Sequence, residues 1–146
     1  MVLSAGVIRS RLGEDSGAGD LVIRPFDEAC LQPASYDLRI SLETVLIRGQ
    51  CTLVPTFEWV ELPSDIAATL RGRSSYGRRG LLLGAGYVDP GFRGQLTLCC
   101  TNMGNEDILL APNTRLVQMI LHEVTGGGDL YNGRYQDSRG VVHARD

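Results

Sequence analysis

The segment GRSSYGRRG, residues 72–80, carries the side chains best suited to bind phosphate. It holds two serine hydroxyls and three arginines, whose planar guanidinium groups match phosphate oxygens in geometry and charge. The segment lacks the GxxxxGK[ST] pattern, so it is not a P-loop. Its residues predict a phosphate-binding turn, and a solvated basic turn is the alternative that this segment alone leaves open.

Two further polar residues stand where chemistry could be done. Asp89 precedes Pro90 and Gly91, a pair that favours a tight turn and holds the carboxylate at the end of a strand. Gln118 lies within the apolar run 115–124, where a buried primary amide must find hydrogen-bond partners. Asp89 by itself is equally typical of an ordinary turn residue.

The adjacent Cys99 and Cys100 could bind a metal, form a redox pair, act as a nucleophile, or be small apolar strand residues. Neighbouring strand residues point to opposite faces of a sheet, so the two thiols cannot bind one ion. The HxE and PCxxC patterns of zinc deaminases are missing. Neither His122 nor His143 is placed to activate a thiol nucleophile. We therefore interpret both cysteines as strand residues.

Composition narrows the function classes. The chain has 146 residues and a formal charge of −3, and its 14 basic residues form no extended stripe, which argues against nucleic-acid binding. Its length predicts a single domain over 1–146. No run approaches the roughly 20 apolar residues that span a bilayer, and neither a signal peptide nor a CxxC spacing is evident. These observations predict a cytoplasmic protein without a membrane segment.

The elements that must position these residues are mainly strands. Residues 4–13 predict one short helix with Ser4 as its N-cap and Gly13 as its stop. The rest predicts an all-β barrel or jelly roll, because short β-rich runs alternate with Gly, Pro, Asn and Asp. The runs expected to form strands are 21–26, 35–41, 44–49, 57–62, 67–73, 95–101, 107–110 and 115–124.

The last segment, 125–146, begins with Thr125, continues with three consecutive glycines, 126–128, and contains few apolar residues. We expect it to be flexible by itself. Its aromatic and polar side chains also suit a lid that closes over a ligand, whereas ordinary terminal disorder is the simpler interpretation.

These segments, in this order, resemble the family of dUTPases and dCTP deaminases. Residues 21–40 are similar to the opening strands of the deaminase branch, and residues 131–140 are similar to its C-terminal closing segment. The resemblance implies a distorted jelly roll of the β-clip type and a homotrimer with active sites between subunits. It also implies that the substrate is a deoxynucleoside triphosphate that carries Mg²⁺ on its phosphates, without metal ligands from the protein.

The resemblance implies roles for individual residues. Asp89 and Gln118 are the implied catalytic residues. In the closing segment Arg134 and Ser138 stand where many family members have Lys and Gln, respectively. The residues implied to bind substrate are Arg73, Ser74, Ser75, Tyr76, Gly77, Arg78, Thr97, Leu98, Cys99, Tyr131, Arg134 and Ser138.

One position divides the two chemistries of this family. Deaminase members resemble one another in placing a glutamate ten residues after the turn aspartate, and Cys99 occupies that position here. A thiol is shorter than a carboxylate and is a poor proton shuttle at neutral pH. The sequence therefore favours a dUTP diphosphatase resembling the archaeal-type dUTPases, in which Asp89 activates water for attack on the α-phosphate of dUTP. The alternatives are a mono- or bifunctional dCTP deaminase and a non-catalytic nucleotide-binding protein.

Overall fold

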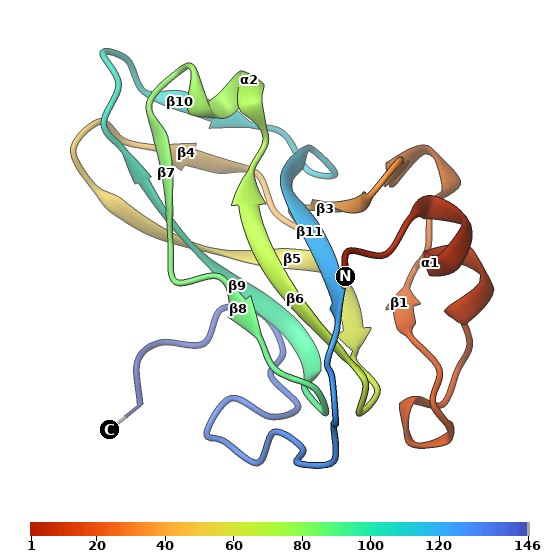
Figure 1. Ribbon diagram of the computed structural model, residues 1–146. Coiled ribbons are helices and arrows are strands. Elements are labelled where there is room, and N and C mark those ends of the chain that lie inside the picture. Colours follow the sequence, from red (N-terminus) through yellow and green to blue (C-terminus); the bar gives the residue numbers. More distant parts are fainter. Residues whose placement is uncertain (146) are drawn as a thin grey trace.

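The computed structural model describes residues 1–145 and consists of two facing β-sheets with a small third sheet at one end (Figure 1). The strand order is β1-β5-β9-β7 in one sheet, β2-β3-β11-β6-β8 in the other, and β10-β4 in the third. The elements are α1 (Ala5–Arg11), η1 (Ser16–Ala18), β1 (Val22–Arg24), η2 (Glu28–Cys30), β2 (Leu31–Gln32), β3 (Ser35–Arg39), β4 (Thr44–Leu46), β5 (Cys51–Glu61), β6 (Ile66–Gly72), α2 (Ser74–Gly77), β7 (Leu81–Gly84), β8 (Tyr87–Val88), β9 (Arg93–Asn102), β10 (Ile108–Leu110) and β11 (Arg115–Glu123).

The predicted all-β class and the N-terminal helix are confirmed. The Ser4 hydroxyl accepts a hydrogen bond from the Val7 N–H and caps α1, which turns Ile8 into the core. The sheets are open and do not close into a barrel, which leaves the jelly roll of the two predicted arrangements. Within residues 1–145 no helix is long and apolar enough to cross a membrane.

Strand β5 is longer than the sequence predicts. It starts at Cys51 and contains Pro55, a residue that normally argues against a strand with neighbours on both sides. The pairing of β5 with β9 shifts register between Pro55 and Trp59, so the strand accommodates the proline at a β-bulge. Strands β7 and β8 were also missed, because a short glycine-flanked apolar run and a two-residue strand carry little periodic signal.

Strand β9 lies between β5 and β7, and its residues alternate between the two sides of its sheet. Leu98 and Cys100 are buried in the core between the sheets. Cys99, which stands between these two in the sequence, is only half-buried, and so is Thr97. Because Leu98 and Cys100 must face the core, the side chains of Thr97 and Cys99 face the other side of the sheet.

The arginine-rich turn is held at one end of the molecule by close contact between two glycines. Gly80 has a φ of +94°, and a Cβ built on it would lie 2.3 Å from the backbone nitrogen of Gly104. The Asn102 side chain supports this contact: its amide donates to the carbonyl oxygens of Leu46 and Glu106, and its oxygen accepts from the Gly104 N–H. In Figure 1, α2 lies at the top of the molecule and the C-terminal segment at the bottom.

We predict that Asn102→Ala lowers the free energy of unfolding by about 2–4 kcal/mol, because it leaves two carbonyls and one N–H without their buried partner. Urea titrations followed by circular dichroism would measure this change. Asn105→Ala is the matched control, since Asn105 is exposed and its side chain makes no hydrogen bond within residues 1–145. Equal urea midpoints for the two variants would contradict the prediction.

Candidate active site

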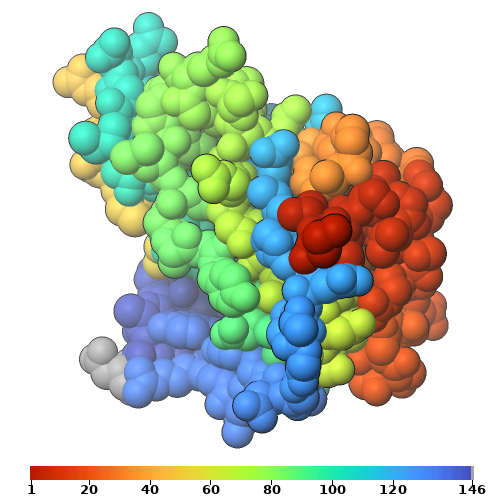
Figure 2. Space-filling view, viewed as in Figure 1, coloured from red at the N-terminus to blue at the C-terminus, as the bar shows by residue number. Residues whose placement is uncertain are grey.

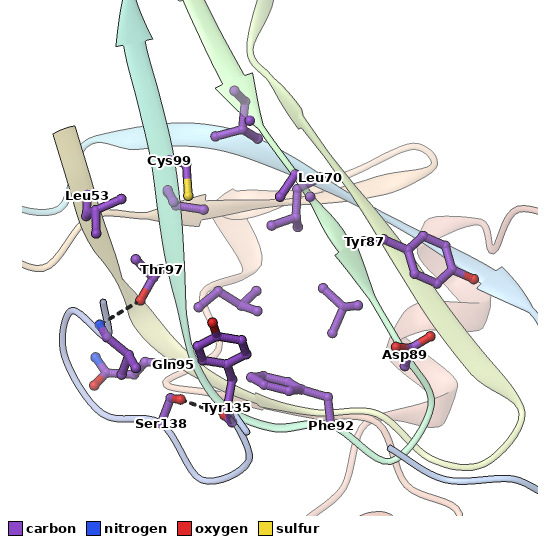
Figure 3. A pocket seen from close by; sticks show the side chains of 18 of the residues that line it. Leu53, Leu70, Tyr87, Asp89, Phe92, Gln95, Thr97, Cys99, Tyr135 and Ser138 are labelled. Atoms are coloured by element: carbon purple, nitrogen blue, oxygen red, sulfur yellow. Dashed lines mark hydrogen bonds between the residues drawn. The ribbon is translucent and has the colours of Figure 1, made fainter. Parts of the chain in front are cut away.

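The main cavity of the described chain has a volume of about 470 Å³ and opens between β9, the β7–β8 segment and the C-terminal segment (Figure 3). Most of its wall is apolar, with a few polar groups, as is usual for sites that bind small molecules. The cavity is lined by Leu53, Leu70, Leu83, Gly84, Ala85, Gly86, Tyr87, Val88, Asp89, Phe92, Gln95, Leu96, Thr97, Leu98, Cys99, Tyr131, Tyr135, Ser138, Val142 and Ala144.

The polar groups of β9 are held by the bulge in β5. The Gln95 side-chain amide donates to the Thr56 carbonyl oxygen at 2.8 Å, and the Thr56 hydroxyl accepts the Leu96 N–H at 3.0 Å. Thr56 itself is fully buried. The proline-induced irregularity thus provides the hydrogen bonds that orient Gln95 at the cavity wall, with Thr97 two residues further along the strand.

Asp89 lies at the turn that leads into β9, where its carbonyl oxygen accepts the Phe92 N–H at 3.2 Å. Gly91 has a φ of +86°, and an added Cβ would lie 2.8 Å from the Leu130 Cβ. Only glycine suits this position. Asp89 is exposed at the cavity wall, and it is the one carboxylate among the described lining residues.

Cys99 lines the cavity at a distance from Asp89. Cys99 lies six positions after Arg93, the first residue of β9, which corresponds to about 20 Å of extended strand at 3.3 Å per residue. Asp89 lies in the turn just before that strand. Figure 3 shows the two side chains on opposite sides of the cavity. Burial raises the pKa of the Cys99 thiol, and the nearby Cys51 thiol raises it further. Cys99 is therefore mostly protonated at neutral pH, which makes it a poor proton acceptor.

The C-terminal segment forms one wall of the cavity. The Tyr131 ring packs edge-on against Phe92 with a centroid distance of 5.7 Å, and the Gln95 N–H donates to the Ser138 carbonyl oxygen at 2.9 Å. Arg139 lies over the Trp59 ring, 4.5 Å from its centroid. Figure 2 shows this segment along the lower edge of the molecule, below the green β7–β8 region. The predicted flexibility of 125–146 remains a prediction, and Asp146 lies outside the described residues.

The structure brings together only part of the predicted site. Among the predicted residues, Asp89, Thr97, Leu98, Cys99, Tyr131 and Ser138 line the cavity. Arg134 does not; its guanidinium donates to the Arg145 carbonyl oxygen at 2.8 Å instead. The whole segment 73–78 is also absent from the lining, because β6 passes the cavity at Leu70 and continues away from it.

Gln118 lies on the outer face of the five-stranded sheet, not in the main cavity. Its register places it opposite Asp37 on β3 and Arg71 on β6. It lines a shallow groove that includes Ser35 and Ile120. The opposite face of β11 carries the buried Val117 and Met119, so the alternation of the strand turns Gln118 outward.

Beside Gln118 is a charged cluster that the sequence analysis did not single out. The buried Asp37 carboxylate lies 3.4 Å from the Arg73 Nε and 3.6 Å from the Arg115 Nη1. Burial raises the Asp37 pKa, although the two arginines oppose that rise. Its Oδ1 atom has no hydrogen-bond partner within residues 1–145. The sequence could have indicated this cluster in one way only: an aspartate lies within the predicted strand 35–41, where a charged side chain needs a partner if it is buried.

The chain thus combines two facing sheets, a cavity of about 470 Å³ and an arginine-rich turn that lies apart from this cavity. A family model described as dCTP deaminase-like matches residues 41–124. The chain belongs to this dCTP deaminase-like family.

Curated relatives agree with this assignment. The chain is 32% identical to a protein of Acidothermus cellulolyticus named "dCTP deaminase, dUMP-forming", with 99% of this chain and 95% of the relative covered. It is 35% identical to a dCTP deaminase of Thermococcus sibiricus, with 82% and 87% covered. The first alignment spans 185 positions, more than the 146 residues of this chain, so that relative carries residues that this chain lacks.

Solved structures show the fold. A dCTP deaminase from Agrobacterium tumefaciens has a TM-score of 0.68 and 22% identity, covering 82% of this chain and 47% of that chain. The EIAV dUTPase has a TM-score of 0.63 and 21% identity, covering 80% and 98%. Both branches of the class therefore share the fold, which by itself does not separate their chemistries.

The prediction of a dUTP diphosphatase is wrong on these comparisons, because the relatives that match nearly the whole chain are named dCTP deaminases. The similarity to dUTPases is one of fold alone. The sequence argument gave Cys99 more weight than the similarity of the whole chain, although one side chain does not determine which group in a cavity moves protons.

We predict that Cys99 reacts with iodoacetamide more slowly than a free thiol such as glutathione at pH 7.5. Each unit by which its pKa exceeds about 8.5 lowers the thiolate fraction roughly tenfold. Above pH 8.5 the rate for Cys99 should continue to rise about tenfold per pH unit, whereas the rate for an ordinary thiol levels off there. The raised pKa of Cys99 moves its deprotonation to higher pH. Peptide mass spectrometry of time points would measure it, with Cys99→Ser identifying the peptide. A rate equal to that of glutathione at pH 7.5 would contradict the raised pKa.

Proposed function

We propose that this protein is a dCTP deaminase. The observation that carries the proposal is the similarity of about 32% over 99% of the chain to proteins named dCTP deaminase, dUMP-forming. The main cavity supports it by size, by its largely apolar wall and by the hydrogen-bonding groups on β9.

The base of the nucleotide would lie along β9. Thr97 and Gln95 present a hydroxyl and an amide to the cavity, and these groups can pair with the edge of a pyrimidine. Leu53 and Leu83 supply apolar contacts for its faces. Discrimination between bases would rest on these few polar groups, because leaving one of them unpaired in an apolar cavity is costly.

The reaction replaces an amino group by an oxygen. Water adds to C4 of the cytosine ring, the carbon–nitrogen bond breaks, and dCTP and water become dUTP and ammonia. A group in the site must accept a proton from the water and deliver one to the departing amine.

Asp89 is the carboxylate that the described cavity offers for this proton transfer. Its position in the Pro–Gly turn leaves it exposed to water. Cys99, which lies across the cavity from Asp89, would take no part in this proton transfer. Under this proposal the proton shuttle lies at the turn and not at the position of the family glutamate.

The triphosphate needs cations, and the described cavity lining contains no arginine, lysine or histidine. The cluster of Arg73 and Arg115 around Asp37 lies at the other sheet, and Ser74 and Ser75 follow Arg73 in the short helix α2. We assign phosphate binding to these arginines and serines. Mg²⁺ would arrive on the phosphates, since residues 1–145 contain no group of three or more metal-binding side chains.

A homotrimer would join the two parts of the site. In one chain the cavity and the arginine-rich turn lie apart, with α2 at the opposite end from the C-terminal segment (Figure 1). A neighbouring copy could present its Arg73 and Gln118 to this cavity, because both lie on or beside the outer face of a sheet.

A non-catalytic nucleotide-binding protein is the second candidate. The specific observation that favours it is Cys99, a protonated thiol at the position where the resemblance implies the deaminase glutamate. This candidate predicts nucleotide binding without release of ammonia.

The first test is incubation of the protein with dCTP and Mg²⁺, with nucleotides resolved by chromatography and ammonia measured by a coupled assay. We expect ammonia and a deoxyuridine nucleotide in equal amounts. Asp89→Asn should bind dCTP but lower the rate by about 10²- to 10⁴-fold, as for a lost general base.

Asp129→Asn is the matched control, since Asp129 is exposed and does not line the cavity. Cys99→Ala should retain most of the rate, because the thiol lies across the cavity from Asp89 and takes no part in the proton transfer. Binding of dCTP without ammonia release by the unmodified protein would refute deamination and favour the second candidate.

The second test concerns sharing of the site between subunits. Arg73→Ala and Asp89→Asn should each be nearly inactive, yet a mixture unfolded and refolded together should regain part of the activity. Some sites in mixed trimers would combine the intact Arg73 of one chain with the intact Asp89 of another. Sedimentation should show three chains per particle. A monomer with full activity, or no recovery in mixed trimers, would contradict the arrangement.

A further inference from the structure

The last described residues of the chain cover part of the cavity wall that a nucleotide would need. The Gly140 N–H donates to the Gln95 Oε1 at 2.6 Å, and the Val142 N–H donates to the Thr97 Oγ1 at 3.0 Å. Figure 3 shows the second of these as a dashed line that ends on Thr97. The hydrogen-bond acceptors that β9 offers to a base are therefore already used by the protein's own backbone.

This terminal part runs in the same direction as β9 with a constant offset. Ser138 forms a parallel bridge with Gly94, and both hydrogen bonds join residues 45 positions apart. The same offset places Ala144 at the level of Cys99, and both residues line the cavity. Residues 140–145 thus follow the wall of the cavity from Gln95 to Cys99.

The end of the segment is tied down as well. The Arg145 N–H donates to the Tyr135 hydroxyl at 3.2 Å, and its guanidinium donates to the Arg134 carbonyl oxygen at 2.7 Å. The Arg134 guanidinium donates in return to the Arg145 carbonyl oxygen at 2.8 Å. These contacts close a loop that presents Val142 and Ala144 to the cavity.

The preceding part of the C-terminal segment has a different position. Asp137 forms two hydrogen bonds of 3.0 and 3.1 Å with the Arg93 guanidinium, and the Asp137 N–H donates to the Arg93 carbonyl oxygen. These contacts lie at the start of β9, so they can persist when residues 140–145 leave. The segment therefore has an anchored part up to Asp137 and a terminal part that covers Gln95 and Thr97 on the cavity wall.

We propose that residues 140–145 are an internal competitor for nucleotide, which must displace them from Gln95 and Thr97 to bind. The identity of the nucleotide rests on the proposed function, whereas the engagement of Gln95 and Thr97 rests on the two hydrogen bonds alone. Two backbone hydrogen bonds of ordinary net strength correspond to an affinity reduced by about 5- to 100-fold.

The test compares two full-length variants. Val142→Pro removes the N–H that Thr97 accepts, and Val141→Pro is the matched control because the Val141 N–H makes no hydrogen bond within residues 1–145. A chain ending at Arg139 removes the terminal part altogether. Calorimetry with dCTP and Mg²⁺ should show a dissociation constant about 2- to 12-fold lower for Val142→Pro, which loses one of the two bonds, and about 5- to 100-fold lower for the shortened chain, which loses both. The constant should be unchanged for Val141→Pro.

Alkylation of Cys99 gives a second readout that needs no nucleotide. The rate of reaction with iodoacetamide should rise at least about twofold in Val142→Pro and in the shortened chain, because loss of even one hydrogen bond of ordinary strength lets residues 140–145 leave the cavity wall more often. The rate for the exposed Cys51 should not change. Equal Cys99 rates in all four proteins would overturn the inference. Failure of every protein to bind dCTP would count against the proposed function, and the alkylation rates would then decide the inference by themselves.

Discussion

The alternation of side chains along β9 is the constraint on which the cavity depends. Pairing with β5 and β7 fixes the position of the strand, and burial of Leu98 and Cys100 fixes which residues face the core. A shift of register by one residue would turn every side chain to the opposite face. The large apolar area buried by the core residues thus maintains the orientation of Thr97 and Cys99, whose own contacts are few.

Local patterns were sufficient for much of the fold. The β-rich runs between turn residues predicted most of the long strands, and Ser4 with the following apolar spacing predicted α1. Strand β5 shows where such reasoning fails. Pro55 looks like a strand breaker in the sequence, but a bulge and the buried Thr56 accommodate it through contacts with a strand about forty residues away. No local pattern reports such a partner.

The sequence predicted part of the cavity lining but not how the candidate residues are distributed over the fold. Motif order brought out Asp89, the residues of β9 and Tyr131, and these do share a cavity. The sequence could not show that Arg73 and Gln118 lie elsewhere in the chain, because strand order in the sheets decides that separation. Asp37 escaped notice for a related reason: its importance comes from two arginines that only the folded sheet brings to within 4 Å.

The stacking of Arg139 on Trp59 has a practical consequence. Trp59 is the one tryptophan of the chain, and the guanidinium 4.5 Å from its ring belongs to the residue between the anchored and terminal parts of the C-terminal segment. The emission of an indole responds to a cation held over its face. The protein therefore carries a built-in optical reporter of this junction, so that stopped-flow fluorescence could time movements of the segment without any attached dye.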